Sequence, residues 1–194
     1  SDVYKRQLVD LANPTITSSE FTLGTDAYSL GGRPAIAAYG AGSGSANPFS
    51  VSGSTFTGNS EATCGNNGYG ISMIWVENSY ASLTNLDISD NGYGTFFTQS
   101  SGELSNSTIE VNCAAVDTKG LKQTGDIQHT FKINDNTLLT ENRAGITAYD
   151  GAKISASNNI ISGVAESSGI AIRSSIETLT GNTNGPIGGS NGIW

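Results

Sequence analysis

The feature that most constrains this chain is an internal repeat. Gly70-Ile71 and Gly94-Thr95 open two segments 24 residues apart, and Gly145-Ile146 and Gly169-Ile170 open two more at the same spacing. A fixed period of this length is typical of solenoids, in which each unit covers the apolar face of its neighbour. The repeat therefore predicts a stack of similar coils.

Each unit contains apolar or β-branched residues at alternate positions. Examples of this period of two are Thr95 and Phe97, Ile146 and Ala148, and Ile170 and Ile172. The alternation predicts a strand with one buried face. A second strand follows after a polar turn, as in 81–91 and 102–112.

We therefore predict an all-β fold, a right-handed parallel β-helix of about six coils of roughly 24 residues each. A β-sandwich is the alternative, but it would need turns every 8 to 12 residues or so. The single β-helix domain is expected over 8–184. Residues 1–7 match nothing downstream and are expected to be a non-native extension. The repeat fades in 185–194, which are expected to be an irregular tail or a truncated coil.

Composition excludes several classes of function. Only 13% of the residues are charged, 25 are glycine, and the net charge is −8. The acidic balance argues against a nucleic-acid partner, which requires a basic surface. No apolar run approaches the ~20 residues that a membrane-spanning helix needs, so no membrane-spanning segment is expected.

Asparagines recur three residues after an apolar strand position. They are Asn59, Asn91, Asn112 and Asn182. Asparagine tolerates the left-handed backbone of sharp turns, and stacked amides hydrogen-bond between layers. We therefore expect these four residues to form a structural ladder.

The two cysteines are interpreted either as a disulfide or as two free thiols without a function. Cys64 and Cys113 follow the ends of units two coils apart, so equivalent positions would lie about 9.6 Å from each other. A disulfide needs Cα atoms within about 7 Å, which would require 61–68 to fold over the neighbouring coil. Without a CxxC spacing or a nearby histidine, no metal site is expected.

Candidate binding residues lie on the first strand of each unit. Trp75, Phe96 and Tyr149 occupy similar places there, and some of them face outward if Thr95 and Phe97 face inward. Outward aromatic rings on a flat sheet suit stacking against a sugar or a protein, unless a loop covers them.

Asp117 and Asp150 complete the set of candidate ligand-binding residues, because they fall in different units and could share a groove. Glycoside hydrolysis also uses two carboxylates, but solvated turn acids are the simpler reading. His129 lacks a catalytic setting. No catalytic residue and no cofactor are expected.

The coils 70–91 (GISMIWVENSYASLTNLDISDN) and 145–163 (GITAYDGAKISASNNIISG) resemble the pectin-lyase-like superfamily of right-handed β-helices. The residue pattern of these coils is most similar to that of passenger domains of autotransporter adhesins. This resemblance implies a non-catalytic scaffold, extracellular or on the bacterial outer membrane, that binds a polysaccharide or a host or cell-surface protein. The alternative is a polysaccharide-active enzyme, lyase or glycoside hydrolase, or a phage tail-spike fragment. The Gly-His-Gly and Arg-Ile-Lys elements of galacturonase-like hydrolases are absent from the sequence.

Overall fold

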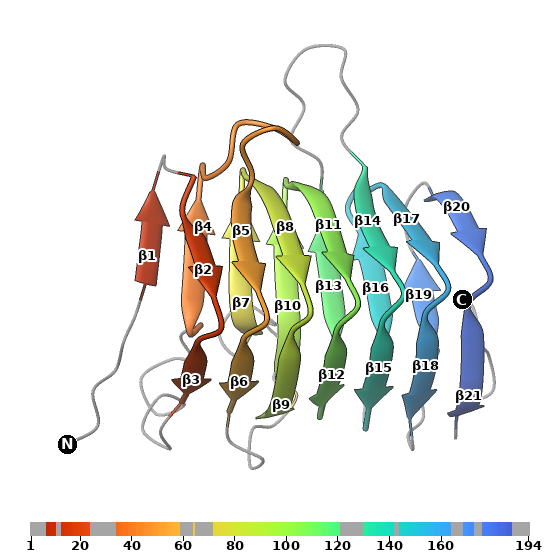
Figure 1. Ribbon diagram of the computed structural model, residues 1–194. Coiled ribbons are helices and arrows are strands. Elements are labelled where there is room, and N and C mark those ends of the chain that lie inside the picture. Colours follow the sequence, from red (N-terminus) through yellow and green to blue (C-terminus); the bar gives the residue numbers. More distant parts are fainter. Residues whose placement is uncertain are drawn as a thin grey trace.

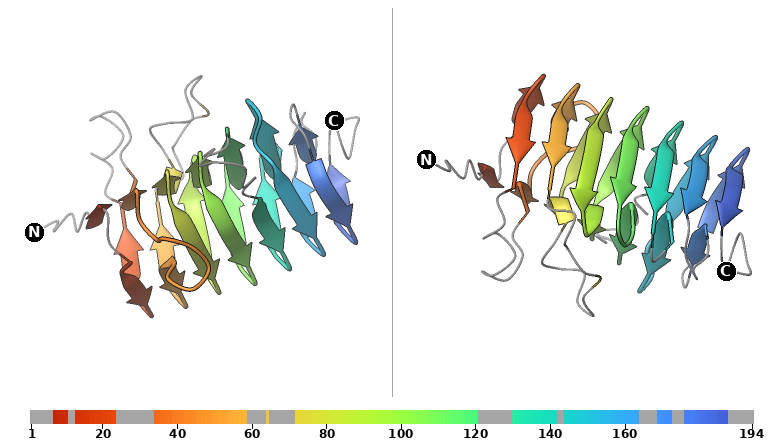
Figure 2. Two further views of the ribbon diagram at one scale, coloured as in Figure 1. Left: turned by 90° about the horizontal axis from the view of Figure 1, so that it is seen from above. Right: turned by 90° about the horizontal axis from the view of Figure 1, so that it is seen from below.

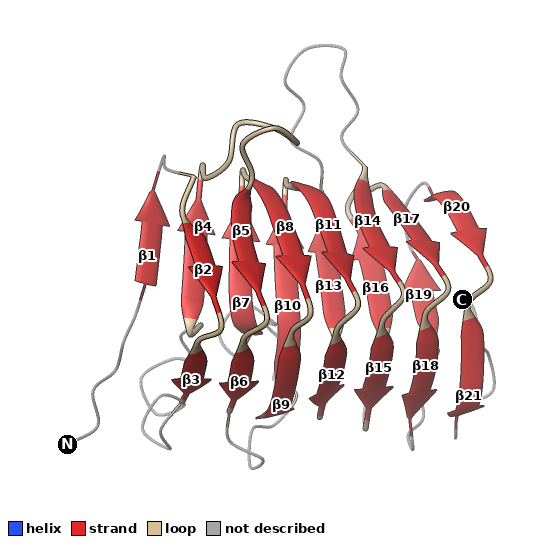
Figure 3. Cartoon of the chain, in the orientation of Figure 1, coloured by secondary structure: helices blue, strands red, loops and turns tan. Residues whose placement is uncertain are grey.

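The computed structural model describes residues 7–10, 13–23, 34–58, 64, 72–120, 130–141, 144–163, 169–172 and 176–187. Every regular element in these ranges is a strand, and the strands form three sheets of seven (Figures 1 and 3). All strand pairs within the sheets are parallel, for example β4 with β7 and β8 with β11. The predicted all-β parallel β-helix is confirmed.

Each turn of the chain passes once through each sheet, so strands that pair in a sheet are three apart in chain order. Sheet A contains β1 (Gln7–Asp10), β4 (Ile36–Tyr39), β7 (Ser72–Glu77), β10 (Tyr93–Thr98), β13 (Val116–Lys119), β16 (Ile146–Tyr149) and β19 (Ile170–Ile172). Sheet B contains β2 (Thr15–Thr17), β5 (Phe49–Ser52), β8 (Tyr80–Thr84), β11 (Ser101–Ser105), β14 (Phe131–Asn134), β17 (Ile154–Ser157) and β20 (Ile176–Thr180). Sheet C contains β3 (Glu20–Thr22), β6 (Thr55–Thr57), β9 (Asp87–Asn91), β12 (Thr108–Val111), β15 (Thr137–Thr140), β18 (Ile160–Gly163) and β21 (Thr183–Ile187).

The winding is right-handed. In Figure 1 the chain rises in the more distant sheet A, descends through the nearer sheets B and C, and advances from left to right. Figure 2 shows the coils following one another along one axis, with the first and the last strands of the three sheets at opposite ends. A crossover of this hand is the one that right-twisted strands favour.

The unit differs from the predicted one in its number of strands. The second strand expected in 81–91 is two strands, β8 and β9, separated by Asn85 and Leu86. Asn85 has a φ of 53°, a left-handed conformation that turns the chain between sheets B and C. Leu83 and Ile88 therefore both point inward, one from each sheet. The five positions from Leu83 to Ile88 therefore span this corner.

Strands also lie just outside both limits of the predicted domain. Gln7, assigned above to a non-native extension, begins β1 and pairs with Ile36. At the other end β21 continues to Ile187, beyond the expected limit of 184, and pairs with β18. Each sheet contains seven strands among the described residues.

The core is a column of apolar side chains enclosed by the three sheets. One continuous cluster extends from Ile16 to Ile170. The equivalent residues Phe21 and Phe56 stack on one another, with rings 4.7 Å apart and nearly parallel. Phe97 of sheet A meets Phe131 of sheet B across the core, with ring centroids 3.8 Å apart. Neighbouring coils thus bury each other's apolar faces.

A ladder of polar side chains follows the corner between sheets B and C. The Oδ1 atoms of Asn136, Asn159 and Asn182 accept hydrogen bonds from the backbone N–H of Ser107, Asn136 and Asn159, at 3.0, 3.1 and 3.0 Å. Nearer the N-terminus the hydroxyls of Ser54 and Ser107 accept in the same way from Ser19 and Leu86. These bonds satisfy backbone donors that the corner would otherwise bury without partners.

The structure divides the four asparagines of the predicted ladder. Asn182 is a rung, whereas Asn91 and Asn112 lie at the opposite end of sheet C, where Asn91 Nδ2 donates to the Tyr93 carbonyl at 2.7 Å. Asn59 lies outside the described residues. An asparagine three residues after an apolar strand position does not always lie at the same corner. Leu179 belongs to sheet B, while Ile88 and Ile109 belong to sheet C. None of the three described asparagines has a positive φ.

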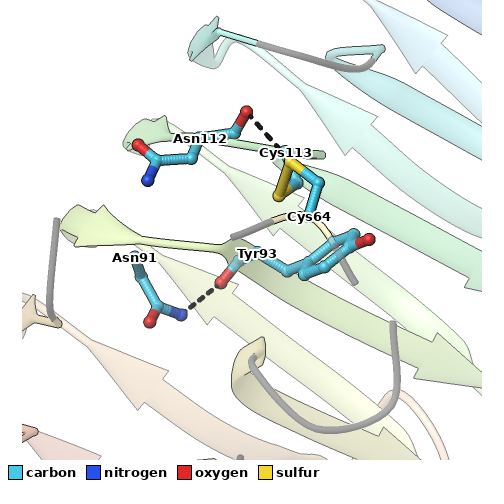
Figure 4. Close-up of a disulfide and its surroundings, with 5 residues drawn as sticks. All are labelled: Cys64, Asn91, Tyr93, Asn112 and Cys113. Atoms are coloured by element: carbon cyan, nitrogen blue, oxygen red, sulfur yellow. Dashed lines mark hydrogen bonds between the residues drawn. A yellow bond between two sulfur atoms is a disulfide. The ribbon is translucent and has the colours of Figure 1, made fainter. Parts of the chain in front are cut away.

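Cys64 and Cys113 form a disulfide with a Cα–Cα distance of 5.5 Å (Figure 4). The open question about the cysteines is thereby answered. Cys64 follows β6 and Cys113 follows β12, so the bond spans the intervening coil at Asn91 and Tyr93. Tyr93 is fully buried against this bridge, in a small cluster separate from the main core. The Cys64 sulfur also lies 3.5 Å from the Asn112 carbonyl oxygen.

Replacing Asn159 with alanine tests the ladder. Its buried amide accepts from Asn136 and donates to the Ile133 carbonyl at 2.8 Å, so truncation leaves several buried groups without partners. We expect Asn159→Ala to lower the free energy of unfolding in urea by about 3 kcal/mol. The matched control is Asn134→Ala, which removes a half-buried outward amide bonded to Ser157 and is expected to cost less than about 1 kcal/mol. Equal losses in the two variants would contradict this role.

Removing the disulfide tests the bridge between coils. It closes a loop with a sequence separation of 49 residues. The double variant Cys64→Ser/Cys113→Ser is therefore expected to lose about 4 kcal/mol of unfolding free energy in urea. Dithiothreitol should destabilise the wild type to the same extent and leave the double variant unchanged. If dithiothreitol does not change the midpoint of urea unfolding of the wild type, the prediction is wrong.

Candidate functional site

The outward face of sheet A collects the predicted binding residues. Parallel register places equivalent residues of successive coils side by side in two rows. The first row is Ala37, Trp75, Phe96, Asp117, Thr147 and Ala171. The second row is Tyr39, Glu77, Thr98, Lys119 and Tyr149. Four of the five predicted residues belong to these rows, and Asp150 directly follows the last of them.

The first row begins with an aromatic cluster. The rings of Trp75 and Phe96 meet edge to face with centroids 5.5 Å apart, and Tyr39 of the second row lies 6.3 Å from Trp75. Trp75 and Tyr39 are half-buried. Phe96 is 0% exposed although it lies outside the main core cluster, so its ring is covered on the outer side of the sheet. Phe96 is therefore closed to a ligand, whereas the Trp75 ring is partly accessible.

The acidic residues differ in accessibility. Asp117 is only 6% exposed and pairs in register with Thr147, whose Oγ1 is buried and has no hydrogen-bond partner among the described residues. The Asp150 side chain is 63% exposed and forms an ion pair with Lys119 at 3.6 Å. Asp150 lies one coil and three residues beyond Asp117, a backbone separation of about 11 Å. One of these two carboxylates is thus buried, and the other carries a basic partner.

The second row ends in a compact group. Lys119 Nζ lies 5.8 Å from the centre of the Tyr149 ring as well as beside the Asp150 carboxylate. An ammonium over a ring face is attracted by the ring quadrupole. Asp150 has a φ of 55° at the turn after β16. The turn and the two attractions hold Lys119 and Tyr149 in a defined arrangement.

Tyr39 has a perturbed hydroxyl at the other end of the row. Desolvation by burial raises the pKa of Tyr39, and the negative charge of Glu77 on the neighbouring strand raises it further. Both effects disfavour the phenolate. Tyr39 therefore stays a neutral hydrogen-bond donor over the physiological pH range.

Sequence reasoning missed most of the second row. Glu77, Thr98 and Lys119 each follow a first-row residue by two positions, so extending the alternation by one step would have found them. Tyr39 lies in a coil whose opening the repeat did not reveal. His129 lies outside the described residues. Within the described ranges, no three His, Cys, Asp or Glu side chains gather to hold a metal ion.

Among the described residues, no helix has the length and apolarity needed to cross a bilayer. Comparison of the chain with protein-family models, curated proteins and solved structures found no match.

The environment of Tyr39 predicts a pH dependence. The folded-state pKa is raised above the unfolded value of about 10, so the contribution of Tyr39 to stability is complete below that pH and is lost as the pH rises through the folded pKa. When the ultraviolet absorbance of tyrosinate is followed against pH, Tyr39→Phe should remove a transition at high pH. Glu77→Gln should move that transition to lower pH, still above the ordinary value because burial remains the larger cause. Glu103→Gln on sheet B is the control; a response equal to that of Glu77→Gln would contradict the assignment.

Proposed function

We propose that this chain is a rigid, non-catalytic β-helix of the extracellular space or cell surface that binds a glycan through the outward face of sheet A. The observation that carries the proposal is the convergence of half-buried aromatic, acidic and basic side chains on that one face. Aromatic rings with hydrogen-bonding groups beside them suit the apolar faces and hydroxyls of sugars.

The cysteines support an extracellular location. Disulfides form and persist in oxidising compartments and are rare where cellular thiols keep cysteines reduced. The Cys64–Cys113 bond joins coils two apart and closes a small buried cluster around Tyr93. A role as a surface adhesin, similar to an autotransporter passenger, fits such a scaffold.

The carboxylates favour binding over hydrolysis. Glycosidases place two carboxyl groups on either side of the scissile bond, about 5 to 10 Å apart, with one of them raised in pKa as the acid. Asp117 and Asp150 do not match this arrangement, because the first is 6% exposed and the second is bonded to Lys119. The proposal therefore assigns the face to recognition.

A glycan array combined with a depolymerisation assay tests the function. We expect binding to at least one glycan, and Trp75→Ala should weaken it about 10- to 30-fold because a large half-buried ring is lost. Tyr80→Ala, which truncates an outward aromatic on sheet B, should bind as the wild type does. Release of reducing ends or unsaturated products from any polysaccharide would refute the non-catalytic reading. Unchanged binding by Trp75→Ala would refute the choice of face.

A further inference from the structure

Burial separates the two rows of sheet A. The centre of the first row is closed, since Phe96 is 0% and Asp117 6% exposed. Every member of the second row is half-buried, from Tyr39 on β4 to Tyr149 on β16. Beside Phe96 and Asp117, a ligand that extends along this face can therefore contact only the second row.

The second row has an ordered chemistry. Along five neighbouring strands it presents an aromatic ring, a carboxylate, a hydroxyl, an ammonium and a second aromatic ring. Four strand spacings separate the two tyrosines, a span of about 19 Å. A single sugar can reach only one end of the row, whereas a chain lying across the strands can reach both.

We propose that the second row is a linear track for an uncharged glycan chain that lies along the solenoid axis. This inference rests on the proposed function. Tyr39 and Tyr149 are the stacking platforms at its two ends, and the groups of Glu77, Thr98 and Lys119 between them bond to sugar hydroxyls.

The charge of the face determines which glycans fit. Glu77, Asp117 and Asp150 supply three carboxylates. Lys119 is the one cation among the described residues of the two rows, and Lys153 lies three residues after Asp150, so the carboxylates outnumber the cations. Lys119 is already held by Asp150 and lies over Tyr149. A uronate polymer would bring repeated negative charges to a net acidic face, in a chain whose total charge is −8. An uncharged chain avoids this repulsion and meets side chains that are already positioned.

The test uses cello-, manno- and xylo-oligosaccharides, from disaccharide to hexasaccharide, with titration calorimetry on the whole chain. We expect the hexasaccharide of at least one series to bind, and its disaccharide to bind at least about tenfold more weakly. Tyr39→Ala and Tyr149→Ala should each weaken hexasaccharide binding roughly 2- to 10-fold. Tyr80→Ala is the matched tyrosine control, and circular dichroism establishes that each variant is folded. Affinity that does not depend on chain length, or tyrosine variants equal to wild type, would overturn the track.

Charge selection is tested with hexagalacturonate. It should bind at least about tenfold more weakly than the best uncharged hexasaccharide. Glu77→Gln should narrow that difference and Glu103→Gln should not; equal affinity for the two hexamers would overturn the inference. A glycan that needs Trp75 but neither tyrosine would refute the track and leave the proposed function standing. Absence of binding to every glycan on the array would refute the proposed function itself.

Discussion

Parallel pairing of successive coils is the constraint on which the rest of this structure depends; the register is continuous in most strand pairs and shifts locally between β9 and β12, β17 and β20, and β18 and β21. Each coil places residues of one kind over residues of the same kind, so that Ile36 pairs with Ile74 and Phe56 with Ile88. The apolar column, the ladder at the corner of sheets B and C and the two outward rows all follow from this one register. A slip of one residue would turn the apolar side chains outward in every coil that follows.

The corner between sheets B and C fixes that register. A residue with positive φ turns the chain in each coil, and the next residue bonds to the coil beside it. The turning residues include Asn85, Asn106, Asp135 and Asn158. The residues that follow these turning residues change along the axis from serine to asparagine. Leu86 is an exception, because its side chain packs in the core. Buried amides must be satisfied to be tolerated, so they favour one alignment of the coils over all others.

Register also explains how the proposed binding face is assembled from residues far apart in the chain. Tyr39 and Tyr149 are separated by more than a hundred positions, yet they belong to one row because both are the last residues of sheet A strands. Their spacing is set by the backbone and so is rigid. A rigid row avoids the entropic cost of ordering a loop when a ligand binds, which favours recognition of an extended and repetitive molecule.

The sequence alone determined the class of fold, the alternation within strands and the lack of a basic surface for nucleic acid, because these depend on local periodicity and composition. It also gave Trp75, Phe96 and Tyr149 similar places on the first strand of their units, whereas the strand register adds Asp117 to the same face. The tertiary structure alone decided which asparagines form the ladder, because Asn91 and Asn182 follow similar local motifs on different sheets. It decided the Cys64–Cys113 bond and the covering of Phe96 as well, since both depend on segments that meet only when the coils stack. The local alternation of apolar and polar residues indicates which face of a strand is apolar. Contacts between distant parts of the chain decide what lies against the other face.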